Sequence, residues 1–119
     1  MVLCEGFTPD LIDNQVRSLR KRQVIASYKL TPGTPGHRYG AYWGIRTDIA
    51  NYGLANPLPC PVEWTMRLAN VPTRLRRMDS NLQEQLINWG FAVCDAALRK
   101  HVDSALAHPG GFPYPGSAR

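Results

Sequence analysis

The sequence predicts an α/β fold dominated by helices, with about three helices and one or two strands. Three segments carry apolar residues at helical spacing, and one segment, residues 38–46, has the alternation typical of a strand. Connectors rich in proline and glycine separate these segments. The chain has 119 residues, 44% apolar and 19% charged, which fits one globular domain with a modest core rather than a disordered chain.

The first helix is predicted over residues 10–29. Its apolar positions recur at mostly helical spacing, at Ile12, Val16, Leu19, Ile25 and Tyr28. The segment TPGTPGH, residues 31–37, follows as a turn-rich connector, because proline fixes φ and glycine supplies positive φ.

The strand is predicted in HRYGAYWGIRT. Tyr39, Ala41, Trp43 and Ile45 alternate there with small or charged residues and one tyrosine. A single strand leaves its backbone groups unpaired. Either a partner strand lies in the loops, or this strand joins a sheet that the chain does not contain.

Two further helices are predicted, over residues 61–70 and 80–105. The first begins near Pro61 and ends before Val71-Pro72, since the residue before proline avoids helical angles. Ser80 and Gln83 form an S-x-x-Q capping box at the start of the second helix. One apolar stripe of this helix contains Leu82, Leu86, Trp89, Val93 and Ala97. A second stripe contains Ile87, Phe91, Cys94, Leu98 and Val102. So wide an apolar face predicts burial against two neighbours.

The basic residues give the chain a formal net charge of +5 and favour anionic partners. Four of them fall within six positions of the first helix and largely off its apolar stripe: Arg17, Arg20, Lys21 and Arg22. These four residues could form a solvated helix face, contact an anionic lipid surface, or bind nucleic acid. No aromatic residue is interleaved for base stacking and no nucleic-acid-binding module surrounds the run, which argues against nucleic acid. Arg74, Arg76 and Arg77 form a second basic group.

The spacing of the possible catalytic and metal-binding residues does not match any known catalytic or metal-binding motif. The three cysteines, Cys4, Cys60 and Cys94, lie far apart in the sequence, and no metal-ligand motif is present. In HVDSA, helical geometry turns Asp103 about 160° away from His101, so the pair cannot orient an imidazole for Ser104. We therefore expect no catalytic residue, no metal and no cofactor.

Four stretches in order resemble the C-terminal region of bacterial patatin-like phospholipases: LIDNQVRSLRKRQVIASYK, YGAYWGIRTDIANYGLAN, NLQEQLINWGFAVCDAALRK and GGFPYP. The resemblance covers residues 11–115. It implies the C-terminal portion of a three-layer α/β/α fold and a lipid acyl hydrolase that uses a Ser–Asp dyad in lipid degradation. The family's G-x-S-x-G elbow and D-G-[GA] motif are absent here, so no catalytic residue is carried over.

This resemblance implies three parts: an unrelated leader (residues 1–10), the patatin-like segment (11–107) and an irregular Pro/Gly-rich tail (108–119). The expected partner is the missing N-terminal catalytic part, and the chain by itself is expected to be inactive. The alternative function is a small basic module that binds nucleic acid or an anionic membrane surface. The uncharged runs are too short for a bilayer and MVLCEGF is no signal peptide, so a cytoplasmic, at most membrane-peripheral, location is expected.

Overall fold

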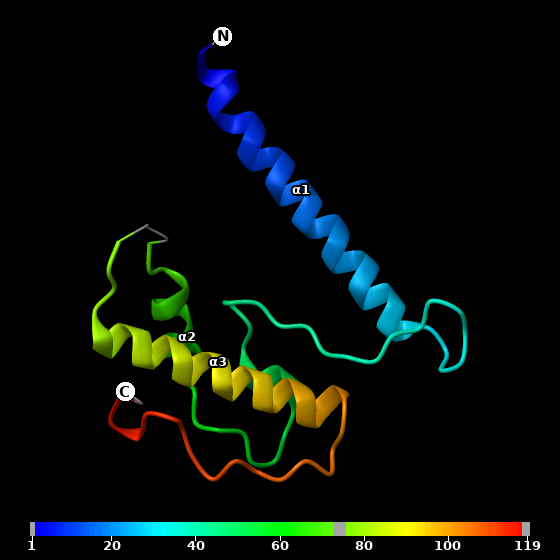
Figure 1. The fold of residues 1–119 in the computed structure, drawn as a ribbon, viewed down its shortest axis with the longest axis vertical. Helices are drawn as coiled ribbons and strands as arrows, with labels where there is room; N and C mark the ends of the chain where they lie inside the picture. The colour runs from blue at the N-terminus through cyan, green and yellow to red at the C-terminus, as the bar shows by residue number, and fades with distance from the viewer. Residues whose placement is uncertain (1, 73–75, 118–119) are drawn as a thin grey trace. The chain divides into compact units, whose positions relative to one another are not determined.

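A computed structural model describes residues 2–72 and 76–117 of the chain. Its elements in order are α1 (Val2–Lys29), the 3₁₀ helix η1 (Ile49–Tyr52), α2 (Val62–Ala69), α3 (Ser80–His101) and the 3₁₀ helix η2 (Pro115–Ser117), as Figure 1 shows. The chain divides into two compact units, one of residues 1–39 and one of residues 40–119.

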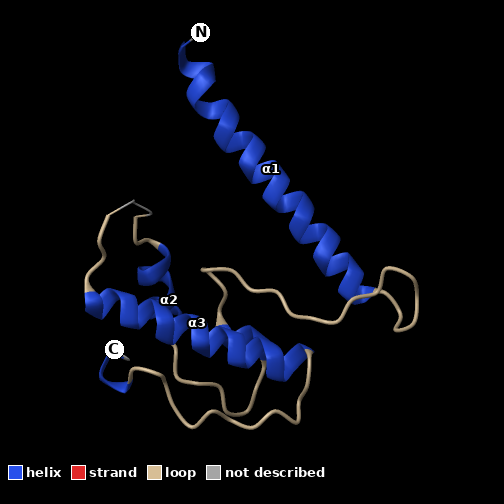
Figure 2. Cartoon of the chain, in the orientation of Figure 1, coloured by secondary structure: helices blue, strands red, loops and turns tan. Residues whose placement is uncertain are grey.

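The prediction of an α/β fold is wrong, because the described residues contain helices and loops and no strand (Figure 2). The segment 38–46 follows an irregular path. Ala41 and Trp43 pack against the core as the alternation suggests, but Tyr39 and Ile45, expected on the same face, are 77% and 43% exposed. The alternation therefore predicted the packing of two side chains correctly. It predicted a strand wrongly, because a strand requires a neighbouring strand with which to form backbone hydrogen bonds.

In the first unit, α1 is longer than predicted and begins at Val2 rather than at Asp10. Residues 2–9 lack apolar periodicity, and Pro9 has no amide hydrogen to donate, so the pattern does not predict helix there. The connector after α1 is confirmed as a run of turns. Gly33 and Gly36 both have a φ of +89°, and the Arg38 amide donates back to the Ser27 carbonyl at 3.2 Å.

In the second unit, α3 packs against α2, η1 and η2. The inner face of α3 confirms the first predicted stripe at Trp89, Val93 and Ala97, which are at most 5% exposed. Ala92 and Ala96 on the same face are fully buried, and such small side chains let neighbouring segments approach the helix closely. The neighbours contribute apolar side chains to this core: Ile49, Tyr52, Leu58, Cys60, Trp64 and Leu68. Each fully buried large side chain stabilises the fold by about 1.5–3 kcal/mol.

The ends of α2 agree with the sequence to within one residue, whereas α3 ends at His101, four residues before the predicted end at residue 105, because the Asp103 carboxylate there holds a turn by accepting from the Ala105 amide. The cap at the start of α3 also differs from the prediction. The N-cap is Asp79 rather than Ser80, and its carboxylate accepts from the Leu82 amide at 3.4 Å. The Gln83 side chain donates instead to the Met78 carbonyl at 2.7 Å, so no capping box forms. Asp79 can cap the helix because its carboxylate accepts from the amide three residues further along the chain, which is the usual geometry of an N-cap. α2 ends at Ala69, before Val71-Pro72, as predicted.

Candidate functional site

The predicted basic residues on α1 all lie exposed on the first unit. Arg17 forms an ion pair with Asp13 one turn earlier, and both side chains stay largely in solvent. An exposed pair of this kind contributes about 0.3–0.5 kcal/mol. Arg20, Lys21 and Arg22 are exposed as well. Of the second predicted basic group, Arg76 and Arg77 are exposed, and Arg74 lies outside the described residues.

α1 also exposes an apolar stripe, made of Ile12, Val16 and Leu19. Their exposed fractions are 54%, 40% and 55%. At about 100° per residue, these three point in nearly the same direction, and Arg20 and Arg22 lie about 80° to either side of Ile12. Arg20 and Arg22 therefore flank the C-terminal end of the apolar stripe, one on each side.

The outer face of α3 consists of Ile87, Phe91, Cys94 and Leu98 and is continued by the C-cap residue Val102. These residues lie within about 40° of one direction, opposite the buried face. Burial of this second stripe was predicted and is wrong for Ile87, Phe91 and Val102, which are 48%, 38% and 47% exposed. Cys94 and Leu98 are half-buried. Within the second unit α3 has apolar residues on both faces and packing neighbours on one, the pattern of a helix made to be covered twice.

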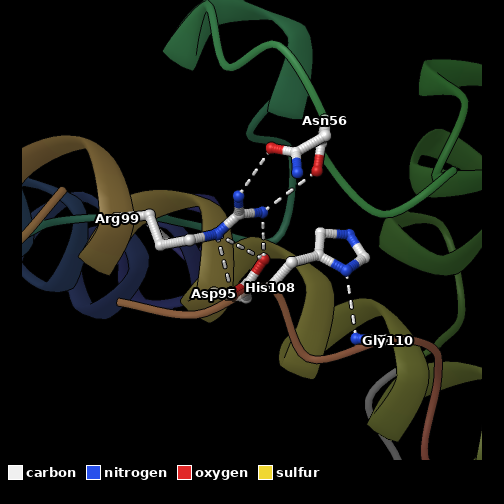
Figure 3. A network of polar contacts seen from close by, with 5 residues as sticks. All are labelled: Asn56, Asp95, Arg99, His108 and Gly110. Atoms are coloured by element: carbon white, nitrogen blue, oxygen red, sulfur yellow. Dashed lines mark hydrogen bonds and ion pairs between the residues drawn. The ribbon is translucent and has the colours of Figure 1, made fainter. Parts of the chain in front are cut away.

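A buried polar network, which sequence reasoning missed, holds the inner side of α3 to the loop after η1 (Figure 3). Arg99 is 6% exposed, and its Nε donates to both carboxylate oxygens of Asp95 at 3.0 and 3.1 Å. Its Nη2 donates to the same carboxylate at 2.6 Å and to the Asn56 carbonyl at 3.2 Å. Its Nη1 donates to Asn56 Oδ1 at 3.0 Å. All three guanidinium nitrogens thus have partners, which makes burial of this charge tolerable.

The remaining contact drawn in Figure 3 belongs to the loop after α3. The Gly110 amide donates to His108 Nδ1 at 3.0 Å, and His108 is exposed. This is a turn contact of the loop.

Asn88 on α3 holds the tail to the helix. Its side-chain nitrogen donates to the Tyr114 carbonyl at 2.8 Å, and its side-chain oxygen accepts from the Tyr114 amide at 3.0 Å. The carboxamide thus pairs with both backbone groups of Tyr114, as a neighbouring strand would. The Ser117 hydroxyl donates to the Glu84 carboxylate. The Phe112 ring packs edge-on against Trp64, with the ring centroids 6.0 Å apart. The tail was predicted as irregular, and its described part, residues 108–117, is ordered by these contacts.

A hydroxyl and a thiol lie in the core between α2 and α3. The Trp89 indole donates to the Thr65 hydroxyl at 3.0 Å, and Cys60 Sγ lies 3.7 Å from the same oxygen. Burial raises the pKa of the Cys60 thiol, the hydrogen bond with Thr65 lowers it, and the charge of Asp48 raises it, with a net increase. A buried cysteine with a raised pKa remains a thiol at neutral pH and is a poor nucleophile.

Because of this raised pKa, the second unit should become less stable at alkaline pH. We expect the free energy of unfolding to fall as the pH rises above about 8.5, because the unfolded thiol ionises there while the folded one stays neutral. Below that pH the contribution is fully present. Urea unfolding followed by tryptophan fluorescence at a series of pH values measures it, with Cys60→Ala expected to flatten the dependence.

Cys94→Ala is the matched control, since it removes a cysteine from the outer face of α3. The buried Tyr52 hydroxyl also has a raised pKa, so the comparison is made below about pH 10, where tyrosine begins to ionise. An unchanged dependence in Cys60→Ala would contradict the assignment.

The residues considered for catalysis do not form a site. α3 ends at His101, whose ring packs edge-on against Tyr52 at 5.7 Å. The Asp103 carboxylate accepts from the Ala105 amide at 2.8 Å, and among the described residues no hydrogen bond or ion pair joins His101 or Asp103 to Ser104. The described residues contain no group of three or more His, Cys, Asp or Glu side chains that could hold a metal ion. None of the described helices has the length and apolarity needed to cross a bilayer.

Comparison with known proteins identifies no relative: no family model, no curated protein and no solved structure matches this chain.

Proposed function

We propose that the chain is a C-terminal segment of a patatin-like serine lipid acyl hydrolase and is catalytically inactive alone. The parent enzyme would cleave fatty-acyl esters through a serine acyl-enzyme, with the serine and aspartate supplied by a catalytic part that this sequence does not contain. The partner in this proposal is that catalytic part, and the parent's role is lipid degradation.

The outer face of α3 carries the proposal. A helix with apolar residues on two faces can bury both of them only when neighbours pack on both sides. α3 buries only its inner face in the second unit, while Ile87, Phe91 and Val102 remain more than one-third exposed. The resemblance to patatin-like phospholipases includes this helix and offers an occupant for the outer face, namely the catalytic part. Covering these three side chains would add roughly 1 kcal/mol each, since each is already partly buried.

A cytoplasmic, membrane-peripheral location goes with this proposal. Cys60 and Cys94 are both free thiols, which supports a reducing compartment.

The chain by itself should not hydrolyse esters. Purified chain incubated with short-chain p-nitrophenyl esters is expected to release nitrophenol no faster than buffer, because no described side chain is placed as an activated nucleophile. Hydrolysis above buffer that a serine-reactive phosphonate abolishes would contradict this expectation.

Association with a catalytic part tests the proposal directly. A patatin-like hydrolase truncated after its D-G-[GA] motif should regain ester hydrolysis when mixed with this chain. Phe91→Glu should prevent the recovery, because it places a charge in the centre of the outer face. Leu106→Glu is the matched control, since Leu106 is 45% exposed and lies outside α3. Equal recovery with both variants would show that the outer face of α3 is not the contact surface.

The DNA upstream of the Met1 codon provides an independent test. Reading all three frames should reveal a G-x-S-x-G elbow followed by a D-G-[GA] aspartate. Finding neither motif would remove the parent enzyme from the proposal.

A further inference from the structure

α1 exposes both an apolar stripe and a group of basic side chains. Every residue from Leu11 to Val24 is exposed, so the helix presents about four turns of its surface to solvent. Residues 10–29 hold five basic and two acidic side chains, and one of the acidic ones, Asp13, is paired with Arg17. Within the turns of the stripe, residues 12–19, Asp13 and Arg17 cancel, so the excess positive charge lies at the C-terminal end of the stripe, on Arg20, Lys21 and Arg22.

The relative position of charge and stripe distinguishes among anionic partners. The stripe of Ile12, Val16 and Leu19 has Arg20 on one edge and Arg22 on the other. A bilayer surface matches this order, because apolar side chains enter the boundary between headgroups and acyl chains while arginines at the rim reach lipid phosphates. A nucleic-acid backbone offers phosphates but no apolar layer for the stripe.

We propose that α1 binds the surface of an anionic lipid bilayer, lying in the plane of the headgroups with its apolar stripe inward. Arg20 and Arg22 make the close phosphate contacts. Arg17 and Lys21 point about 140° and 180° from Ile12 and therefore face away from the membrane. This proposal concerns the chain as it stands and does not depend on the patatin-like assignment.

Two double variants with the same change in net charge provide the test. A helix is about 10 Å across, close to the Debye length at physiological salt, so charges on its far side are strongly screened from the lipid. Arg20→Gln with Arg22→Gln should weaken binding at least about tenfold, since each basic residue near the surface contributes about 1 kcal/mol. Arg17→Gln with Lys21→Gln should weaken it by about threefold or less.

The measurement is co-sedimentation of the full chain with vesicles of phosphatidylcholine alone or mixed with phosphatidylserine. Binding is expected only to the mixed vesicles and should weaken with added salt. Leu19→Gln should also weaken it, and because Leu19 is 55% exposed this change leaves the helix folded, as circular dichroism would verify.

Three outcomes would overturn the proposal. No binding to mixed vesicles, or equal binding to phosphatidylcholine alone, would show that anionic lipid is not the partner. Equal losses in the two double variants would mean that net charge alone attracts the chain. Tight binding to duplex DNA that is insensitive to Leu19→Gln, with weaker binding to vesicles, would assign the basic run to nucleic acid instead.

Discussion

Replacing Arg99 with alanine should lower the free energy of unfolding of the second unit by about 3–5 kcal/mol, the largest effect we expect from one substitution. Arg99 is 6% exposed, and the Asp95 carboxylate beside it is 12% exposed. Alanine would leave that carboxylate charged and without its partner in a mostly dry environment. It would also remove both hydrogen bonds to Asn56, which hold the loop after η1 against α3.

Urea unfolding followed by tryptophan fluorescence measures this loss, because Trp43, Trp64 and Trp89 all belong to the second unit. Lys100→Ala is the control: it removes a neighbouring basic side chain that is exposed and should change stability by at most about 0.5 kcal/mol. Arg99→Lys should recover only part of the loss, since a single ammonium cannot contact Asp95 and Asn56 with the geometry of the guanidinium. If Arg99→Ala cost no more than Lys100→Ala, the network would be unimportant to the fold.

Replacing Asn88 with alanine should cost about 2–4 kcal/mol and release the tail from α3. Asn88 is fully buried, and its carboxamide is the partner of both the amide and the carbonyl of Tyr114. Alanine removes both hydrogen bonds at once and leaves a small cavity. The packing of Phe112 against Trp64 should loosen as the tail detaches.

Limited proteolysis with subtilisin reports this release, because subtilisin cleaves accessible, flexible segments with little sequence preference, so a detached tail is open to cleavage within residues 104–117. Cleavage there should become faster in Asn88→Ala than in the unchanged chain. Asn81→Ala provides the comparison, since Asn81 is an exposed asparagine on the same helix. Equal cleavage rates in the two variants would mean that other contacts hold the tail.

The helices were easier to predict from this sequence than the segments that pack against them. The apolar spacing that predicts α2 and α3 arises from contacts within one or two turns, which the sequence displays directly. The strand predicted at residues 38–46 could not be tested in the same way, because a strand forms only when a neighbouring strand pairs with it, and the local sequence does not show such a neighbour. Ala41 and Trp43 pack on the core without such a neighbour.

The polar residues that organise the second unit carried no signal of their own. Arg99 lies 43 positions from Asn56, and Asn88 lies 26 positions from Tyr114. Arginine and asparagine on a helix are ordinarily assigned to the surface, since they are seldom buried without partners. Their burial became evident only when the loop after η1 and the tail were folded against α3.

The sequence by itself determined where the basic run of α1 and the apolar stripes of α3 lie on their helices, because helical periodicity assigns each residue a direction. Only the tertiary structure decided which of those directions are covered. It buried Trp89, Val93 and Ala97 but left Ile87, Phe91 and Val102 at the surface. The physical reason is that burial depends on what packs against a face, and an apolar stripe specifies its own direction but not its neighbour.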